Sequence, residues 1–251
     1  MALFECNYHS AVLELSQSVT VIIPQDIKEN EKIKVLYLLH GYIGNHTDWV
    51  RYTSIERYVQ SHRIAVVMPA VNNSYYTDMV FGLRYFTYVS EELPKLIAST
   101  FPISTRKEDQ YVCGLSMGGY GALKIALTYP ERYHKAASLS GALDLEHIRE
   151  LAKQNNRFDF FVATFGEQTT KKTKNDLNTL VQQAKSKKMT LPDLYLACGT
   201  EDFLYQDNQE FLSFLKQEDV KFTYEESKGD HNWGFWDTYI QKVLQWMFKT
   251  S

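Results

Sequence analysis

The chain of 251 residues is long enough for one large domain, and its 44% of hydrophobic residues can supply a sizeable core. Its net charge of −3 gives no basic surface of the kind that binds nucleic acid, and no stretch approaches the roughly 20 apolar residues of a membrane span. The three cysteines are widely spaced and form neither a disulfide framework nor a metal motif. Because the N-terminus also lacks a basic region followed by a long apolar run, the sequence predicts a cytoplasmic protein.

The first part of the chain alternates short apolar runs with polar loops. Residues 3–24 alternate polar and apolar positions, which predicts an antiparallel hairpin at the edge of a sheet. The uninterrupted apolar runs at 35–39 and 64–69 predict central strands that are covered on both faces. Residues 88–99 have helical spacing, and Pro94 inside that segment predicts a kink.

A His-Gly pair follows the first of these central strands, at the edge where open α/β sheets bind their ligands. A turn in this place commonly supplies a backbone N–H group that can stabilise an oxyanion. The candidate donor is the N–H of Tyr42, with Gly41 beside it in the site. Trp49, further along the same loop, is interpreted as one wall of the pocket, with simple packing beneath the loop as the alternative.

The segment Gly114-Leu115-Ser116-Met117-Gly118 lies between an apolar run and a helical pattern. A Gly-x-Ser-x-Gly between a strand and a helix is typical of a nucleophile elbow, in which a strained turn lifts the serine hydroxyl clear of the sheet. The glycines are needed because side chains there would collide with a neighbouring strand and with the next helix. The turn also directs the N–H of Met117 toward the same space, as a second oxyanion donor. The alternative is a glycine-rich turn in an ordinary βα unit.

After a further predicted strand at 136–140, the composition changes. Residues from about 143 to 190 are richer in Lys, Gln and Asn, have helical character and carry a cluster of phenylalanines between 158 and 165. We interpret this segment as a cap-like insertion within a single domain that spans 1–251. Aromatic residues exposed on the insertion would also allow a homo-oligomer.

A serine hydroxyl needs a neighbouring base, and that base needs an orienting acid. In proteins with this type of elbow the chain order is Ser, then acid, then His. His40 precedes the serine and is therefore interpreted as structural. Three histidines follow the serine. Of these, His134 leads into a strand at the wrong end of the sheet and His147 lies in the insertion. His231 follows the last predicted strand, at the correct edge, and is the candidate base.

The acid should follow a strand that precedes the candidate base. Asp202 fits, since it lies three residues beyond the glycine that ends a predicted core strand. Asp144 and Glu201 are the alternatives. Asp193 precedes its strand and so lies at the wrong end, and Asp230 is adjacent to the candidate base, so that its side chain should diverge from the imidazole.

Four segments together resemble the esterase D family, which includes the S-formylglutathione hydrolases, and within it most closely the tributyrin esterases (EstA type) of lactic acid bacteria and streptococci. The resemblance implies an α/β-hydrolase fold, with a mostly parallel central sheet and flanking helices, and hydrolysis of short-chain carboxylic esters. It implies Ser116 as nucleophile, His231 as base, Asp202 as acid, and Tyr42 and Met117 as oxyanion donors. The four segments are His40-Gly41, Gly114–Ala122, Gly199–Asp202 and Gly229–Trp233.

The sequence therefore predicts a serine carboxylesterase that acts on a small-molecule ester, from acetyl to butyryl, and needs no metal or organic cofactor. Feruloyl or cinnamoyl esterase, carbohydrate acetyl esterase and transfer of the acyl group to another alcohol remain open. A glutathione thioesterase is weakened because Tyr42-Ile43-Gly44-Asn45 stands where that branch has a cysteine-containing loop. The non-enzymatic alternative is a binding module on a hydrolase fold, which would have no use for all three residues of the predicted triad.

Overall fold

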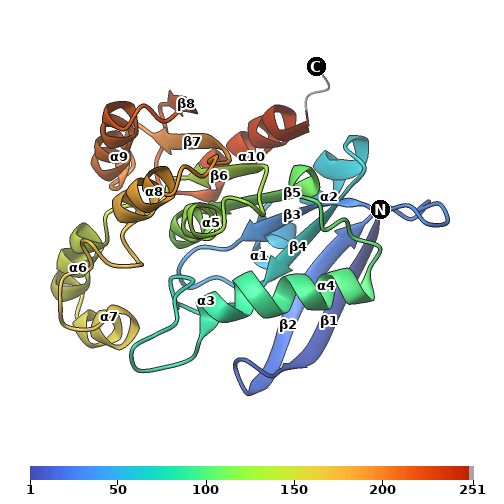
Figure 1. Cartoon of the computed structure of the whole chain (residues 1–251), viewed down its shortest axis with the longest axis horizontal. Coiled ribbons are helices and arrows are strands. Elements are labelled where there is room, and N and C mark those ends of the chain that lie inside the picture. Colours follow the sequence, from blue (N-terminus) through green and yellow to red (C-terminus); the bar gives the residue numbers. More distant parts are fainter. Residues whose placement is uncertain (249–251) are drawn as a thin grey trace.

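An eight-stranded sheet forms the centre of the structure, a computed structural model in which residues 1–248 are described (Figure 1). The strand order is β1-β2-β4-β3-β5-β6-β7-β8. β2 pairs antiparallel with β1 and with β4, and the other neighbours pair in parallel. The strands are β1 (Ala2–Ser10), β2 (Leu15–Ile23), β3 (Lys34–Leu39), β4 (Ile64–Pro69), β5 (Gln110–Leu115), β6 (Lys135–Leu139), β7 (Asp193–Gly199) and β8 (Phe222–Ser227).

Helices cover both faces of this sheet (Figure 1). One apolar cluster packs residues of α4 to α9 against one face, and a second packs residues of α1, α2 and α10 against the other. The predicted architecture, a mostly parallel sheet with flanking helices and an antiparallel hairpin at one edge, is confirmed. The helices are α1 (Asp48–Tyr52), α2 (Ile55–Tyr58), α3 (Tyr85–Thr87), α4 (Leu93–Thr100), α5 (Met117–Thr128), α6 (Leu145–Gln154), α7 (Phe158–Phe165), α8 (Leu177–Ser186), α9 (Tyr205–Gln217) and α10 (Trp233–Phe248).

The central strands are apolar throughout because each of their two faces is buried. In β3, Tyr37 and Leu39 pack in the first cluster, whereas Leu36 and Leu38 pack in the second. Successive side chains of a strand point to opposite faces, so a strand covered on both sides has no position for a solvated residue. The prediction of central strands from the two uninterrupted apolar runs is therefore confirmed.

The helix predicted over 88–99 is interrupted in the structure. The chain is helical from Tyr85, widens into a single π-helical segment at Tyr88–Glu92, and continues as α4 with Pro94 in its first turn. Pro94 follows these helical turns directly, and because it has no N–H it cannot bond back to a carbonyl group of the preceding turn. The structure thus has a π-helical turn at Tyr88–Glu92 before the proline, and a kink at Pro94 stays a prediction.

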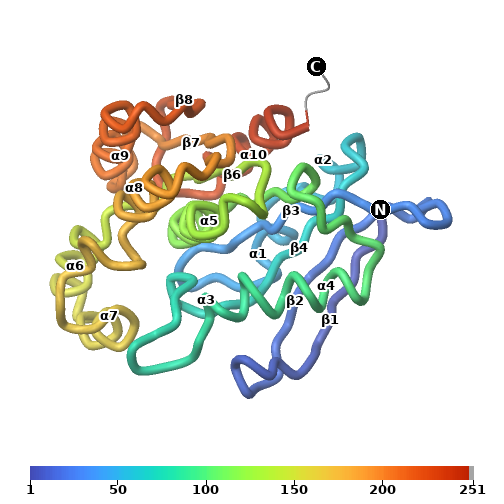
Figure 2. Tube along the Cα trace, in the orientation of Figure 1, coloured from blue at the N-terminus to red at the C-terminus, as the bar shows by residue number. Residues whose placement is uncertain are grey.

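The segment predicted as a cap-like insertion carries α6, α7 and α8. Figure 2 traces it between β6 and β7, on the side of the molecule away from the β1–β2 hairpin. Its role as a cap and the assignment of 1–251 to one domain stay predictions, and residues 249–251 lie outside the described part of the chain. Within residues 1–248 no helix is both long and apolar enough to cross a membrane.

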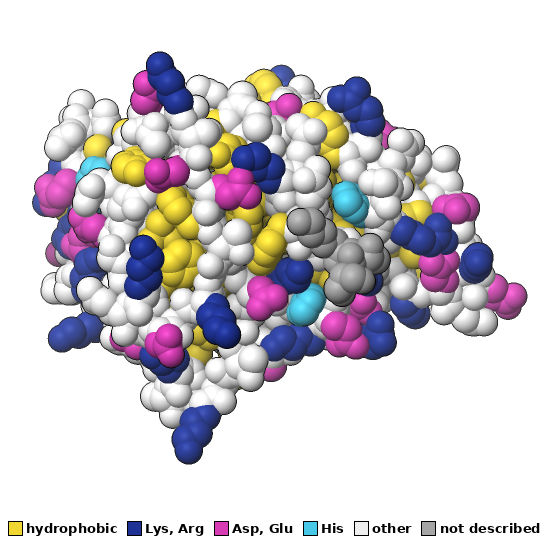
Figure 3. Space-filling model, turned by 90° about the horizontal axis from the view of Figure 1, so that it is seen from above, with side chains coloured by type: hydrophobic (Ala, Val, Ile, Leu, Met, Phe, Trp, Pro, Cys, Tyr) yellow, Lys and Arg dark blue, Asp and Glu magenta, His cyan; other side chains and the backbone are white. Residues whose placement is uncertain are grey.

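The surface carries charges of both signs. On the face shown in Figure 3, basic and acidic side chains are interspersed and separate small hydrophobic patches. This distribution agrees with the small net charge of −3.

The turn between β5 and α5 depends on a close approach of backbone to backbone. A Cβ atom at Gly118 would lie 2.5 Å from the Leu39 carbonyl oxygen and 2.6 Å from that of His40, at the end of β3. A Cβ atom at Gly114 would lie 2.2 Å from the Gly118 carbonyl oxygen. Because these neighbours are backbone atoms, they cannot move aside as a flexible side chain would.

We expect Gly118→Ala to lower the free energy of unfolding by about 2–3 kcal/mol, because the added methyl group must push α5 away from the end of β3. Urea denaturation of the two proteins measures the change. Gly234→Ala is the matched control, since the nearest atom to its Cβ is the movable Asn232 Oδ1 at 3.2 Å, and this alanine should change stability by less than about 1 kcal/mol. Equal losses in both variants would contradict the explanation.

Candidate active site

Ser116 is held in a strained backbone conformation at the end of β5. Its φ and ψ are 53° and −118°, a combination that costs a non-glycine residue on the order of 1–3 kcal/mol. Its N–H donates to the Leu139 carbonyl oxygen of β6 at 2.8 Å, and its carbonyl oxygen accepts from the N–H of Ala142 at 3.1 Å. These bonds fix the turn from both sides and so fix the direction of the Cα–Cβ bond of Ser116.

Ser116, His231 and Asp202 form a continuous chain of hydrogen bonds. His231 Nε2 lies 2.9 Å from Ser116 Oγ, and His231 Nδ1 lies 2.8 and 3.0 Å from the two carboxylate oxygens of Asp202. The Asp202 side chain is fully buried and also accepts the N–H of Leu204 at 2.9 Å. A carboxylate can only accept from Nδ1–H, which leaves Nε2 to accept the serine hydroxyl proton.

Two aromatic rings hold the imidazole of His231 in place. The Trp236 ring meets it nearly at right angles with ring centroids 4.9 Å apart, and the Phe203 ring lies 4.6 Å away on centroids. Trp236 is itself fixed, because its indole N–H donates to Ser140 Oγ at 3.1 Å. The imidazole therefore has little freedom to rotate away from Ser116.

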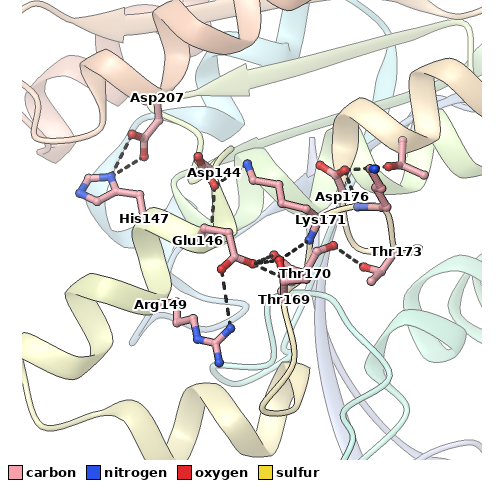
Figure 4. A network of polar contacts seen from close by, with 12 residues as sticks. Asp144, Glu146, His147, Arg149, Thr169, Thr170, Lys171, Thr173, Asp176 and Asp207 are labelled. Carbon is pink, nitrogen blue, oxygen red and sulfur yellow. Dashed lines mark hydrogen bonds and ion pairs between the residues drawn. The ribbon is translucent and has the colours of Figure 1, made fainter.

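The rival acid and base from the insertion belong to a separate polar network (Figure 4). Asp144 caps α6 by accepting the N–H of Glu146 at 2.9 Å, and it pairs with Lys171 at 2.9 Å. His147 Nδ1 lies 2.8 Å from a carboxylate oxygen of Asp207 in α9. Both side chains thus have partners of their own that tie α6 to its neighbours.

The other candidates for the base and the acid do not join the chain of hydrogen bonds from Ser116 either. His134 and Asp193 stand at the beginnings of β6 and β7, the opposite end of the sheet from Ser116. Asp230 accepts the backbone N–H of His231 at 2.6 Å and does not bond to its ring, and Glu201 lies 3.7 Å from Lys228 Nζ.

The loop after β3 passes close to Ser116, since a Cβ atom at Gly41 would lie 3.6 Å from Ser116 Cβ. Within the described chain neither the Tyr42 N–H nor the Met117 N–H has a hydrogen-bond partner. His40 Nδ1–H donates to the Gly41 carbonyl oxygen at 2.7 Å, and its Nε2 accepts the Val71 N–H at 3.1 Å. Because the C=O and N–H of one peptide point in opposite directions, the bond to Gly41 turns the Tyr42 N–H the other way.

A cavity of about 860 Å³ opens over Ser116 and His231. Its lining falls into two groups, which come from elements on opposite faces of the sheet. The insertion lines the cavity mostly with apolar side chains, from Ile148, Leu151, Ala152, Phe160, Phe161 and Phe165, and also contributes the polar residues Asn155, Arg157 and Thr164. The chain segments that follow β3 and β8 line the cavity with polar and aromatic side chains, which include Asn45, Asp48, Arg51, Tyr52, Asn232 and Trp233.

Gly41 and Tyr42 line this cavity, whereas Trp49 does not. The Trp49 side chain is fully buried, and its indole N–H donates to the Leu39 carbonyl oxygen at 3.1 Å. The prediction of Trp49 as a pocket wall is therefore corrected: its ring packs at right angles beneath Trp233, with centroids 5.2 Å apart.

Sequence reasoning did not single out several residues of the cavity. Tyr52 and Phe203 could have been suspected from the sequence, since each is a large aromatic residue within three positions of a predicted site residue. In the structure their side chains are 49% and 56% exposed. Among residues 1–248 no group of three or more His, Cys, Asp or Glu side chains could hold a metal ion.

Known proteins match this chain over nearly its full length. Residues 10–247 match the family model described as "Esterase: Putative esterase". An acetyl esterase of Caldicellulosiruptor saccharolyticus is 35% identical over 265 residues, which cover 100% of both proteins. The substrate-bound structure of a fluorophosphonate-binding serine hydrolase of Staphylococcus aureus superposes with a TM-score of 0.92 at 35% identity, over 99% of each chain.

An S-formylglutathione hydrolase of Staphylococcus aureus, solved as the apoenzyme, superposes with a TM-score of 0.90 at 34% identity, again over 99% of each chain. These relatives, together with the sheet described above, confirm the predicted α/β-hydrolase fold. The chain belongs to the esterase family and is a carboxylic ester hydrolase.

Proposed function

We propose that this esterase hydrolyses short-chain acyl esters in two steps, with Ser116 as nucleophile, His231 as general base and Asp202 as the orienting acid. The observation that carries the proposal is the unbroken chain of hydrogen bonds from Ser116 Oγ through His231 to Asp202. A tributyrin-type substrate, a cytoplasmic location and a homo-oligomer stay predictions from the sequence.

In the first step the Ser116 hydroxyl attacks the ester carbonyl while His231 Nε2 takes its proton. The imidazolium then gives this proton to the leaving alcohol, and an acyl-enzyme remains. Water enters, His231 takes one of its protons, and attack on the acyl group releases the acid and restores Ser116. Asp202 is fully buried, so its charge stabilises the imidazolium in surroundings where water screens little.

The oxyanion of each tetrahedral intermediate would be bound by the N–H groups of Tyr42 and Met117. Each such donor is worth about 3–4 kcal/mol in comparable enzymes. Met117 is the first residue of α5, where the partial positive charge of the helix end adds to the stabilisation. His40 supports the other donor, because its bond to Gly41 fixes the peptide that carries the Tyr42 N–H.

A short acyl group is the first candidate because a relative that matches the full length of the chain is named an acetyl esterase. An aromatic acyl group is the second candidate. The phenylalanines of the apolar lining and the volume of about 860 Å³ would accommodate a cinnamoyl ring, since aromatic rings pack favourably edge to face.

Initial rates on p-nitrophenyl acetate, butyrate, octanoate and palmitate and on methyl ferulate test the proposal. We expect the rate to be highest with acetate or butyrate, and Ser116→Ala to lower kcat by at least about 10⁴-fold because the nucleophile is removed. A maximum at ferulate would favour the second candidate. Activity retained in Ser116→Ala would exclude Ser116 as the nucleophile.

The two aspartates give a matched pair of variants. Asp202→Asn should lower kcat by about 10³–10⁴-fold, because an amide at this position favours the wrong imidazole tautomer. Asp144→Asn should leave kcat within about twofold, since asparagine caps a helix as well as aspartate does. Steady-state kinetics on p-nitrophenyl acetate compare them. A large loss in Asp144→Asn with none in Asp202→Asn would reverse the assignment of the acid.

His40 should make the stability of the protein depend on pH. Burial lowers the pKa of His40 to about 4, whereas a histidine in the unfolded chain has a pKa of about 6.5. The unfolded chain thus binds a proton first as the pH falls, and stability that is complete above pH ~6.5 declines toward pH ~4 by about 2–3 kcal/mol.

Urea unfolding at several pH values between 7.5 and 4.5 measures this decline. His40→Asn should show a shallower loss than the wild type over the same range, because the variant lacks the titrating imidazole while every carboxylate is unchanged. Identical slopes in both proteins would mean that His40 takes no part in the acid destabilisation.

A further inference from the structure

Lys124 is a basic residue that the proposed mechanism does not use and that the protein buries completely. It lies in α5, about two helical turns after Ser116, is 2% exposed and does not line the cavity. Within residues 1–248 no carboxylate pairs with its amine. Burial lowers the pKa of Lys124 well below its usual range, because a charge without a counterion is costly to keep away from water.

Three oxygen atoms surround the amine of Lys124. Its Nζ lies 2.6 Å from Thr77 Oγ1, 2.8 Å from Asn175 Oδ1 and 3.2 Å from the carbonyl oxygen of Tyr76. The Thr77 hydroxyl donates its own proton to the Tyr75 carbonyl oxygen at 3.0 Å, so toward Lys124 it can only accept. Only the charged form of lysine has three N–H donors, one for each of these oxygen atoms.

Two of these contacts hold the loop formed by residues 72–77 in a strained conformation. Tyr75 and Tyr76 have φ of 50° and 49°, in the left-handed region that is unfavourable for bulky side chains. The carbonyl oxygen of Tyr76 accepts directly from Lys124, and that of Tyr75 is bound through the Thr77 hydroxyl. Lys124 therefore holds both of the strained tyrosines by their carbonyl groups.

The same loop in turn holds the chain on both sides of the Tyr42 N–H. Before it, the Tyr76 hydroxyl donates to the His40 carbonyl oxygen at 3.0 Å. After it, the Ile43 N–H donates to Asn73 Oδ1 at 2.7 Å. The peptide that carries the candidate oxyanion donor lies between these two bonds, so its direction depends on the position of the loop.

We propose that Lys124 is a positioning residue of this esterase, which holds loop 72–77 so that the Tyr42 N–H is directed at the oxyanion. This role rests on the proposed function, in which Tyr42 is an oxyanion donor. Because Lys124 does not line the cavity, it acts on the transition state through the loop and not on the bound ester. The alternative is a lysine that only ties α5 to the insertion through Asn175, which would affect stability and leave catalysis unchanged.

Lys124→Met keeps the length of the side chain and removes its donors. With p-nitrophenyl acetate we expect kcat to fall about 10–100-fold and KM to change less than about twofold, because the oxyanion donor is no longer fixed. Leu127→Ala is the matched control, since it removes a buried side chain from the same helix. It should lower the melting temperature and leave kcat within about twofold. An unchanged kcat in folded Lys124→Met would overturn the proposal.

A double-mutant cycle shows whether Lys124 acts through the loop. Tyr76→Phe removes the bond to His40 and should itself lower kcat about tenfold. Lys124→Met/Tyr76→Phe should lie within about threefold of the less active single variant, because both changes release the same peptide. Losses that multiply in full would overturn the proposal. Thr77→Val, which removes only the link to Tyr75, replaces Lys124→Met in the cycle if that variant does not fold.

A boronic acid tests the oxyanion donors separately from turnover. Butylboronic acid adds to the Ser116 oxygen, and one hydroxyl of the tetrahedral boronate takes the place of the oxyanion. Its inhibition constant should rise in Lys124→Met by about the factor by which kcat/KM falls, and should not change in Leu127→Ala. Equal inhibition of Lys124→Met and the wild type would contradict a role in positioning Tyr42. Failure of the proposed function would appear separately, as hydrolysis by Ser116→Ala.

Discussion

The close packing of α5 against the end of β3 is the constraint on which the rest of the site depends. Gly118 has no side chain, so the first turn of α5 lies directly against the carbonyl oxygens of Leu39 and His40. This contact places the first turn of α5, which begins at Met117, against the end of β3, from which the loop with Tyr42 continues. Two donors on separate elements can stabilise one oxyanion only if these elements are held at a fixed separation. In the proposed mechanism the glycines of the elbow therefore set the catalytic geometry as well as the fold.

The topology of the sheet explains why the cavity has two different ends. Ser116 follows β5, near the middle of the sheet, and the cavity above it reaches over both faces. On one face the insertion supplies α6 and α7, whose buried side chains join the larger apolar cluster with α5. On the other face stands α1, which has only five residues. So short a helix buries Trp49 beneath the cavity and leaves Arg51 and Tyr52 beside its mouth.

Sequence patterns predicted those features that depend on spacing along the chain. An uninterrupted apolar run indicates a strand covered on both faces, and chain order singled out Asp202 and His231, which the structure brings against one another and Ser116. Features that depend on which side chain a neighbouring element covers were not predictable. Trp49 and Trp233 are both tryptophans near predicted site residues, yet only the tertiary packing of α1 against α10 decides that the first is buried and the second lines the cavity.

The two ends of the cavity suit the two products of ester hydrolysis. An acyl group gains most from apolar contact, because removal of its surface from water is favourable in proportion to area. In the proposed mechanism the alcohol receives a proton from His231 and then leaves, and polar lining suits such a hydrated product. The buried Asp202 and the rings of Trp236 and Phe203 shield the imidazole between these ends. In the proposed mechanism, proton transfer through His231 would thus take place in surroundings protected from water.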